Sequence, residues 1–232
     1  MLTVLILLIV ASTLIGLGVH FIPVGGAPAA LSTTAGIPTG APMITIGMGV
    51  SGILVTSSVI GNSIITVLLS GMSASMLMMA ITMFFSNLVH VYGVGVNIAS
   101  ATFKKDPITS FNQEEYISPG TTGHGIATVS FISGLIGSLL GGMGGSLLYL
   151  VIYNTLSTSS YANQAGILAA LLTLMVFFVI AVMSSYNIGG TIQGFYDKKF
   201  KSKLKSGVIA SFLTAIVISI IYIIILGGLI YV

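Results

Sequence analysis

The sequence predicts an all-α integral membrane protein with about six membrane-spanning helices in a single domain, residues 1–232. Three observations lead to this prediction. Hydrophobic residues make up 55% of the chain, whereas charged residues make up only 5%. The apolar residues are gathered in long runs, and a helix needs about 20 of them to cross a bilayer. The charged residues fall in two short segments. This composition excludes a water-soluble globule.

Six apolar runs, each of about the length that a membrane-spanning helix needs, follow one another along the chain. We expect the spans at 2–21, 43–60, 64–90, 126–153, 165–186 and 208–230. No Lys or Arg precedes the first run, and the run is longer than a signal-peptide core, so we expect a retained helix. The segment 23–42 contains four Pro, four Gly and no charge. It disfavours a helix and suits a loop that re-enters the membrane under cover of other protein.

All 11 charged residues lie in two segments that two spans separate, and the cations are all Lys. The segments contain Lys104, Lys105, Asp106, Glu114 and Glu115, and then Asp197, Lys198, Lys199, Lys201, Lys203 and Lys205. Two spans return the chain to the side it left, so both segments lie on one side, which the excess of Lys predicts to be cytoplasmic. Three spans precede the first segment. Both termini therefore face outward, and His20 comes to the cytoplasmic boundary.

Several functional classes are disfavoured by what the chain lacks. With no Cys, it has neither a disulfide nor a thiolate nucleophile or metal ligand. The 7 Lys are topology signals in a lipid-embedded chain, so nucleic acid is not expected as a partner. No Asp, Glu, Lys or Arg lies inside the predicted spans, which disfavours an autonomous pump or a proton-coupled carrier. The acids lie only in the two charged segments, and no nucleophile elbow is present, so we assign no catalytic residue.

Small residues recur at every fourth position of the run 126–153, in two adjacent rows. The first row is Ser130, Gly134, Ser138, Gly142 and Ser146, and the second is Ser133, Gly137, Gly141 and Gly145. Rows of this kind let another helix backbone approach closely, which is how membrane helices pack. We expect a packing helix here, and a pore lined by bare backbone is the alternative.

A glycine-rich turn precedes the fourth span, with Gly120, Gly123, His124 and Gly125. Backbone N–H groups at a helix N-terminus favour an anionic ligand. The turn lacks the Lys of a phosphate-binding loop, so a plain turn into the helix is the alternative. At the end of the fifth span, Ser184, Asn187 and Thr191 place neutral oxygens beside helix-breaking glycines. Such oxygens bind Na⁺ in transporters, and a polar helix C-cap is the alternative.

Five blocks of sequence resemble one known family. They are 18–30, 91–96, 105–109, 118–126 with its Ser-Pro-Gly and Gly-His-Gly-Ile, and 185–195 with its Ser-Tyr-Asn-Ile-Gly-Gly-Thr. In this order they resemble the D-type membrane subunit of tetrahydromethanopterin S-methyltransferase, a membrane complex of methanogenic archaea. The last span is similar to that family only in hydropathy. Thr122 replaces an acidic residue of the family pattern, which removes a charge next to His124.

The resemblance implies a subunit of an enzyme that moves a methyl group from methyl-tetrahydromethanopterin, through a cobamide on another subunit, to the thiol of coenzyme M. In the family, this transfer drives Na⁺ outward across the cell membrane. The partners expected are the other membrane and cytoplasmic subunits and the lipid bilayer, and Na⁺ is the coupling ion. A stand-alone secondary carrier and a purely structural scaffold are the two alternative functions.

Overall fold

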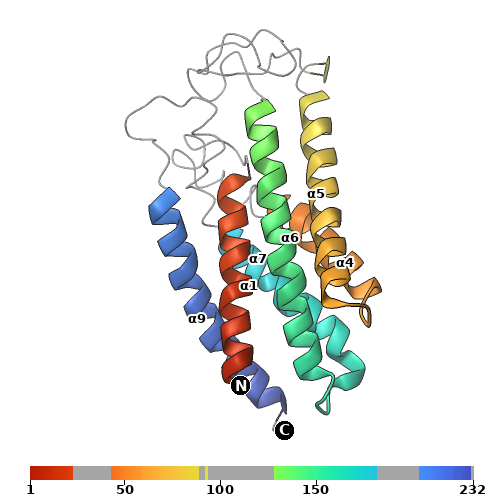
Figure 1. Ribbon diagram of the computed structural model, residues 1–232, viewed down its shortest axis with the longest axis vertical. Helices are drawn as coiled ribbons and strands as arrows, with labels where there is room; N and C mark the ends of the chain where they lie inside the picture. The colour runs from red at the N-terminus through yellow and green to blue at the C-terminus, as the bar shows by residue number, and fades with distance from the viewer. Residues whose placement is uncertain (23–42, 89–91, 94–127, 182–203, 231–232) are drawn as a thin grey trace.

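The computed structural model describes residues 1–22, 43–88, 92–93, 128–181 and 204–230. Within these ranges the chain is helical and contains no strand. The long helices are α1 (Leu2–Phe21), α5 (Ile64–Leu88), α6 (Thr128–Leu156), α7 (Ala165–Ala181) and α9 (Leu204–Ile230). Shorter elements are the π-helix η1 (Met43–Val50), α4 (Ser51–Ser58) and the 3-10 turn η3 (Ala162–Gln164). Figure 1 shows them as one bundle.

Among the residues that the structure describes, five helices are long and apolar enough to cross a membrane, namely Leu2–Phe21, Ile64–Phe85, Phe131–Leu156, Ala162–Ala181 and Lys205–Ile230. The fold is therefore that of an all-α membrane protein. The predicted second span, 43–60, differs from the others because it is divided between η1 and α4, of 8 residues each. Sixteen helical residues reach at most about 24 Å, less than the roughly 30 Å of a bilayer core. The count of six spans stays a prediction.

Local chemistry explains where the helices begin and end. Helix α1 ends before Pro23, and Ile22 is extended, as expected for a residue that precedes proline. The turn from α4 to α5 contains Gly61 with φ +96°, a left-handed conformation that glycine adopts without strain. Ser63 then caps α5, because its hydroxyl accepts the backbone N–H of Thr66 at 3.2 Å.

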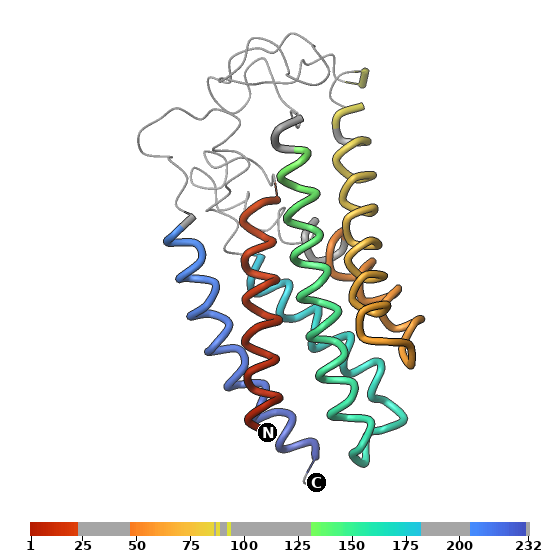
Figure 2. The backbone as a smooth tube through the Cα atoms, viewed as in Figure 1, coloured from red at the N-terminus to blue at the C-terminus, as the bar shows by residue number. Residues whose placement is uncertain are grey.

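The start of α1 and the end of α9 lie at the same end of the bundle (Figure 2). Helices α1, α5 and α7 run away from that end, and α6 and α9 return to it. The first charged segment stands between α5 and α6 in the chain, and most of the second stands between α7 and α9. Both segments therefore follow helices that end at the same end of the bundle. Which end is cytoplasmic stays a prediction.

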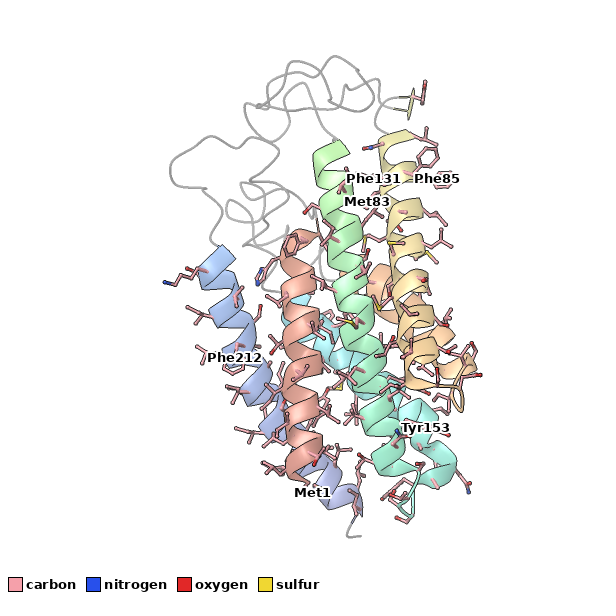
Figure 3. All side chains as sticks on the ribbon, viewed as in Figure 1. Met1, Met83, Phe85, Phe131, Tyr153 and Phe212 are labelled. Atoms are coloured by element: carbon pink, nitrogen blue, oxygen red, sulfur yellow. The ribbon has the colours of Figure 1, made fainter. Side chains whose placement is uncertain are left out.

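Helix α6 occupies the centre of the bundle and packs against α1, α5, α7, α4 and η1, whereas α9 packs mainly against α1. The core contains fully buried apolar side chains from each of these regions, including Leu8, Met48, Met79, Leu148 and Phe177. Large apolar side chains on the outer faces of α5 and α9 remain exposed, as expected for surfaces that lipid or partner subunits cover. Figure 3 shows one such side chain on each helix, Phe85 and Phe212.

Candidate functional site

One row of small residues on α6 faces α4 and α5. A Cβ placed on Gly142 would lie 2.6 Å from Oγ of Ser75 and 3.1 Å from the carbonyl oxygen of Gly71, both on α5. One turn further along α6, the Ser146 hydroxyl lies 2.8 Å from that of Thr56 on α4. The backbones of α5 and α6 therefore approach more closely than any larger side chain would allow.

The second row faces other partners. Ser133 donates a hydrogen bond to the carbonyl oxygen of Phe21, at 2.8 Å. A Cβ on Gly137 would lie 2.5 Å from the carbonyl oxygen of Gly18 on α1. The next two members of the row, Gly141 and Gly145, would meet Met48 of η1 and Phe177 of α7 in the same way. The two rows thus contact several different elements.

Of the remaining residues in the two rows, Gly134 and Ser138 are buried, and the Ser138 hydroxyl bonds within its own helix to the carbonyl oxygen of Leu135. Ser130 lies in the first turn of α6, and its side chain falls outside the described residues. Sequence reasoning missed Gly144, at which a Cβ would lie 2.6 Å from the carbonyl oxygen of Ala11. The doublet Gly144-Gly145 was the signal, because it adds a third small face.

Buried hydroxyls and carbonyls form a polar cluster where η1, α4, α5 and α6 meet. Ser75 donates to the carbonyl oxygen of Met48 at 2.7 Å, and Ser146 donates to that of Gly142 at 2.8 Å. Thr56, Ser75 and Ser146 are fully buried. Each hydroxyl has a partner, so the cluster joins four elements by neutral hydrogen bonds inside the bundle. Sequence reasoning missed Gly71 and Ser75, whose spacing of four on α5 repeats the pattern of α6.

His20, in the last turn of α1, is buried against the start of α9. Its Nε2 lies 2.9 Å from the Ser211 hydroxyl and 3.1 Å from the carbonyl oxygen of Gly207. Gly207 makes room for the ring, because a Cβ at that position would lie 3.1 Å from the imidazole. The imidazole therefore ties the start of α9 to the end of α1.

The residues predicted to bind ligands lie outside the described residues. Gly120, Gly123, His124 and Gly125 fall in 94–127, and Ser184, Asn187 and Thr191 fall in 182–203. Both sites therefore stay predictions. Across the described ranges, no group of three or more His, Cys, Asp or Glu is placed to hold a metal ion.

Comparison with known proteins decides the family. A sequence profile for MtrD, the D-type subunit of tetrahydromethanopterin S-methyltransferase, matches residues 1–215. The chain belongs to this family. The MtrD of Methanothermobacter thermautotrophicus is 48% identical over 206 residues, which cover 88% of each chain. That of Methanopyrus kandleri is 44% identical over 221 residues, covering 95% of each. That of Methanosarcina mazei is 42% identical over an alignment of 240 positions, which covers 97% of this chain and 96% of the relative.

The family resemblance predicted from the five sequence blocks is thereby confirmed. All five blocks lie inside the matched range 1–215. The protein is a membrane subunit of a methyltransferase complex, and that membership implies other subunits as its partners.

Proposed function

We propose that this protein works in the membrane part of a complex that couples methyl transfer to the outward movement of Na⁺. The methyl group passes from methyl-tetrahydromethanopterin through a cobamide, which we place on a partner subunit, to coenzyme M. Family membership supports the reaction. We propose that the side chains of this protein pack its helices together and help to bind and orient Na⁺ and coenzyme M. We assign none of them a covalent step.

One observation on the described helices favours a shared rather than an autonomous ion path. Within the described ranges there is no Asp, Glu or Arg, and Lys205 at the start of α9 is the only Lys. The buried hydroxyls Thr56, Ser75 and Ser146 already bond to protein groups. A dehydrated cation inside a membrane requires a charged or multi-oxygen environment. These helices need a partner subunit to supply the negative charge.

Transport by the intact complex is the decisive test. Purified complex in sealed vesicles should take up ²²Na⁺ when methyl-tetrahydromethanopterin and coenzyme M are supplied, and the chain alone should not. Uptake by the chain alone would establish the stand-alone carrier instead. Methyl transfer without any Na⁺ movement in tight vesicles would contradict the proposed coupling.

The neutral oxygens of Ser184, Asn187 and Thr191 are our proposed contribution to the Na⁺ shell, completed by a carboxylate of a partner. Asn187→Leu should leave the complex assembled but weaken the Na⁺ stimulation of methyl transfer, because one oxygen ligand is lost without a change of charge. Asn163→Leu, on the exposed η3 turn, is the matched control. Identical Na⁺ dependence in both variants would make Asn187 a helix cap and favour the scaffold function.

The turn at Gly120, Gly123, His124 and Gly125 is our proposed anion site for the sulfonate of coenzyme M. A bulky side chain at Gly123 would keep the backbone N–H groups from the anion. Gly123→Val should raise KM for coenzyme M with little change in kcat, and Gly228→Val, where the added side chain meets open space, should not. An unchanged KM in an intact complex would move the sulfonate site to another subunit.

Sidedness is tested by labelling. The chain has no Cys, so single cysteines introduced into it can be followed by mass spectrometry. Lys105→Cys and Lys201→Cys should react with an impermeant reagent only from the cytoplasmic side, and Ser159→Cys only from outside. Reaction of the two Lys positions from opposite sides would contradict the proposed topology.

A further inference from the structure

A line of small and polar residues runs between α1 and α9, and we call it the α1–α9 seam. On α1 it consists of Ser12, Gly16 and His20, and on α9 of Gly207, Ser211, Ala215 and Ser219, each set at intervals of four residues. All seven residues are buried. Two contacts fix the pairing, because His20 bonds to Ser211 and a Cβ on Gly16 would lie 2.7 Å from Cβ of Ser211.

Two hydroxyls of the seam have no hydrogen-bonding partner among the described protein groups. They belong to Ser12 and Ser219, each only 1% exposed. Other hydroxyls in these helices bond to the backbone of their own helix, as Thr13 does to the carbonyl oxygen of Ile9 at 2.7 Å. Leaving a hydroxyl unsatisfied in an apolar interior costs about 1–3 kcal/mol. Two unsatisfied hydroxyls in one seam therefore indicate a bound molecule that forms hydrogen bonds to both.

The antiparallel pairing of the helices brings these hydroxyls near each other. Gly16 lies opposite Ser211, so Ser12, one turn back on α1, lies opposite Ala215 and one turn from Ser219. One turn of four residues rises about 6 Å. Side chains lean toward the N-terminus of their own helix, so in this antiparallel pair the two hydroxyls lean toward each other, and one molecule with O–H···O distances of about 2.8 Å is able to bond to both. Ala215, which stands between them along the seam, adds only a methyl group.

The chemistry of the seam indicates which molecule binds there. Its polar side chains are neutral hydroxyls and one imidazole, and His20 is the one residue of the seven that is able to carry a charge. A metal cation needs more oxygen ligands than Ser12 and Ser219 supply. Water needs only two to four polar partners and is the common occupant of polar buried sites. At the far end of the seam, the Tyr222 hydroxyl donates to the carbonyl oxygen of Leu172 at 2.6 Å.

We propose that a buried water molecule bridges Ser12 and Ser219 in the α1–α9 seam and continues the polar line that His20 and Ser211 begin. The seam then holds α9 on α1 through hydrogen bonds along about three helical turns. This water site does not depend on the proposed Na⁺ coupling.

A double-mutant cycle in the purified complex tests the shared water. Ser12→Ala and Ser219→Ala should each lower the thermal midpoint of this protein by about 2–4 °C, because each leaves the other hydroxyl unsatisfied. The double variant should be no less stable than the less stable of the two single variants, since no unsatisfied hydroxyl remains. Ser138→Ala, whose hydroxyl bonds within its own helix, is the matched control, and its effect should add to that of Ser12→Ala.

A density map of the wild-type complex that resolves ordered water decides the matter independently of variant folding. The expected result is a water peak within hydrogen-bond distance of both hydroxyls. Additive losses for Ser12→Ala and Ser219→Ala, or no loss in either, would overturn the proposal. So would a map in which both hydroxyls bond to carbonyl oxygens of their own helices with no water between them.

Discussion

Helices α6 and α9 are both long and apolar, yet they occupy opposite situations in the bundle. The candidate span in α9 has the higher mean hydropathy, 2.8 against 1.8 for that in α6. Nevertheless 61% of the α6 span is buried inside the protein and only 22% of the α9 span. In a soluble protein the more hydrophobic helix is expected to be the more buried one. Here the order is reversed.

The reason lies in what the surroundings offer each helix. Lipid tails are as apolar as Ile or Leu, so a hydrophobic side chain gains little by leaving lipid for protein. A helix in a membrane is buried when its backbone packs closely against other helices, and this close packing requires small residues at the contact. Helix α6 presents Gly137, Gly141, Gly142, Gly144 and Gly145 to its neighbours. Helix α9 presents Gly207 to α1, whereas a Cβ added at either of its other two glycines, Gly227 and Gly228, would meet no neighbouring group within 4 Å.

The largest effect should come from a bulky residue on the central helix. Gly142→Leu places a side chain where Oγ of Ser75 lies 2.6 Å from the Cβ position and the carbonyl oxygen of Gly71 lies 3.1 Å from it. Neither helix backbone is able to move away without opening its other contacts, so overpacking should cost about 3 kcal/mol or more. We expect most of the variant to be lost from the purified complex in size-exclusion profiles, while Gly227→Leu assembles normally.

Shortening a side chain on α6 should lower the free energy of unfolding more than shortening one on α9. Leu148 is fully buried, and Leu213 is 57% exposed. Leu148→Ala should destabilise the protein by about 2–5 kcal/mol, and Leu213→Ala by less than about 0.5 kcal/mol. Thermal midpoints of the two variants make the comparison. Equal losses would show that a partner subunit covers α9 as tightly as this chain covers α6.

Removing the His20 imidazole should weaken the attachment of α9 to α1 and leave the packing of α6 unchanged. His20→Ala leaves the Ser211 hydroxyl and the Gly207 carbonyl without the partner that they share. We expect a loss of about 1–3 kcal/mol, together with faster hydrogen exchange at the start of α9 and unchanged exchange in α6. His20→Gln, which restores a donor and an acceptor, should recover part of the loss. Unchanged exchange at α9 would mean that apolar contacts alone hold it.

A smaller effect than that of His20→Ala is expected at the polar cluster that joins α4 to α6. Ser146→Ala removes the bond to Thr56, but Thr56 can still bond to the backbone of its own helix. We therefore expect a loss of only about 0.5–1.5 kcal/mol. Thr155→Ala, at a hydroxyl that bonds to the carbonyl oxygen of Val151 within the same helix, is the control and should change less.

Hydropathy predicted the positions of most helices, because long apolar runs in lipid have few alternatives to a helix. It did not predict the division of 43–60 into η1 and α4, since a π-helical turn leaves no mark on composition. The spacing of small residues indicated close packing along α6, but not which neighbour each row contacts. That depends on how the helices cross, as does the burial of His20 between α1 and α9. The predicted ligand-binding turns lie in segments that the structure does not describe.

The central claim is that close approach, and not hydropathy, places α6 at the centre. It is tested most directly by adding one methyl group to each helix. Alanine is the better helix former by about 0.8–1.0 kcal/mol, so Gly228→Ala, in open space, should leave the thermal midpoint unchanged or raise it. Gly137→Ala should lower it, because the new Cβ would lie 2.5 Å from the carbonyl oxygen of Gly18. A lower midpoint for Gly137→Ala, with an unchanged or higher one for Gly228→Ala, supports the account, and a midpoint that rises equally in both variants contradicts it.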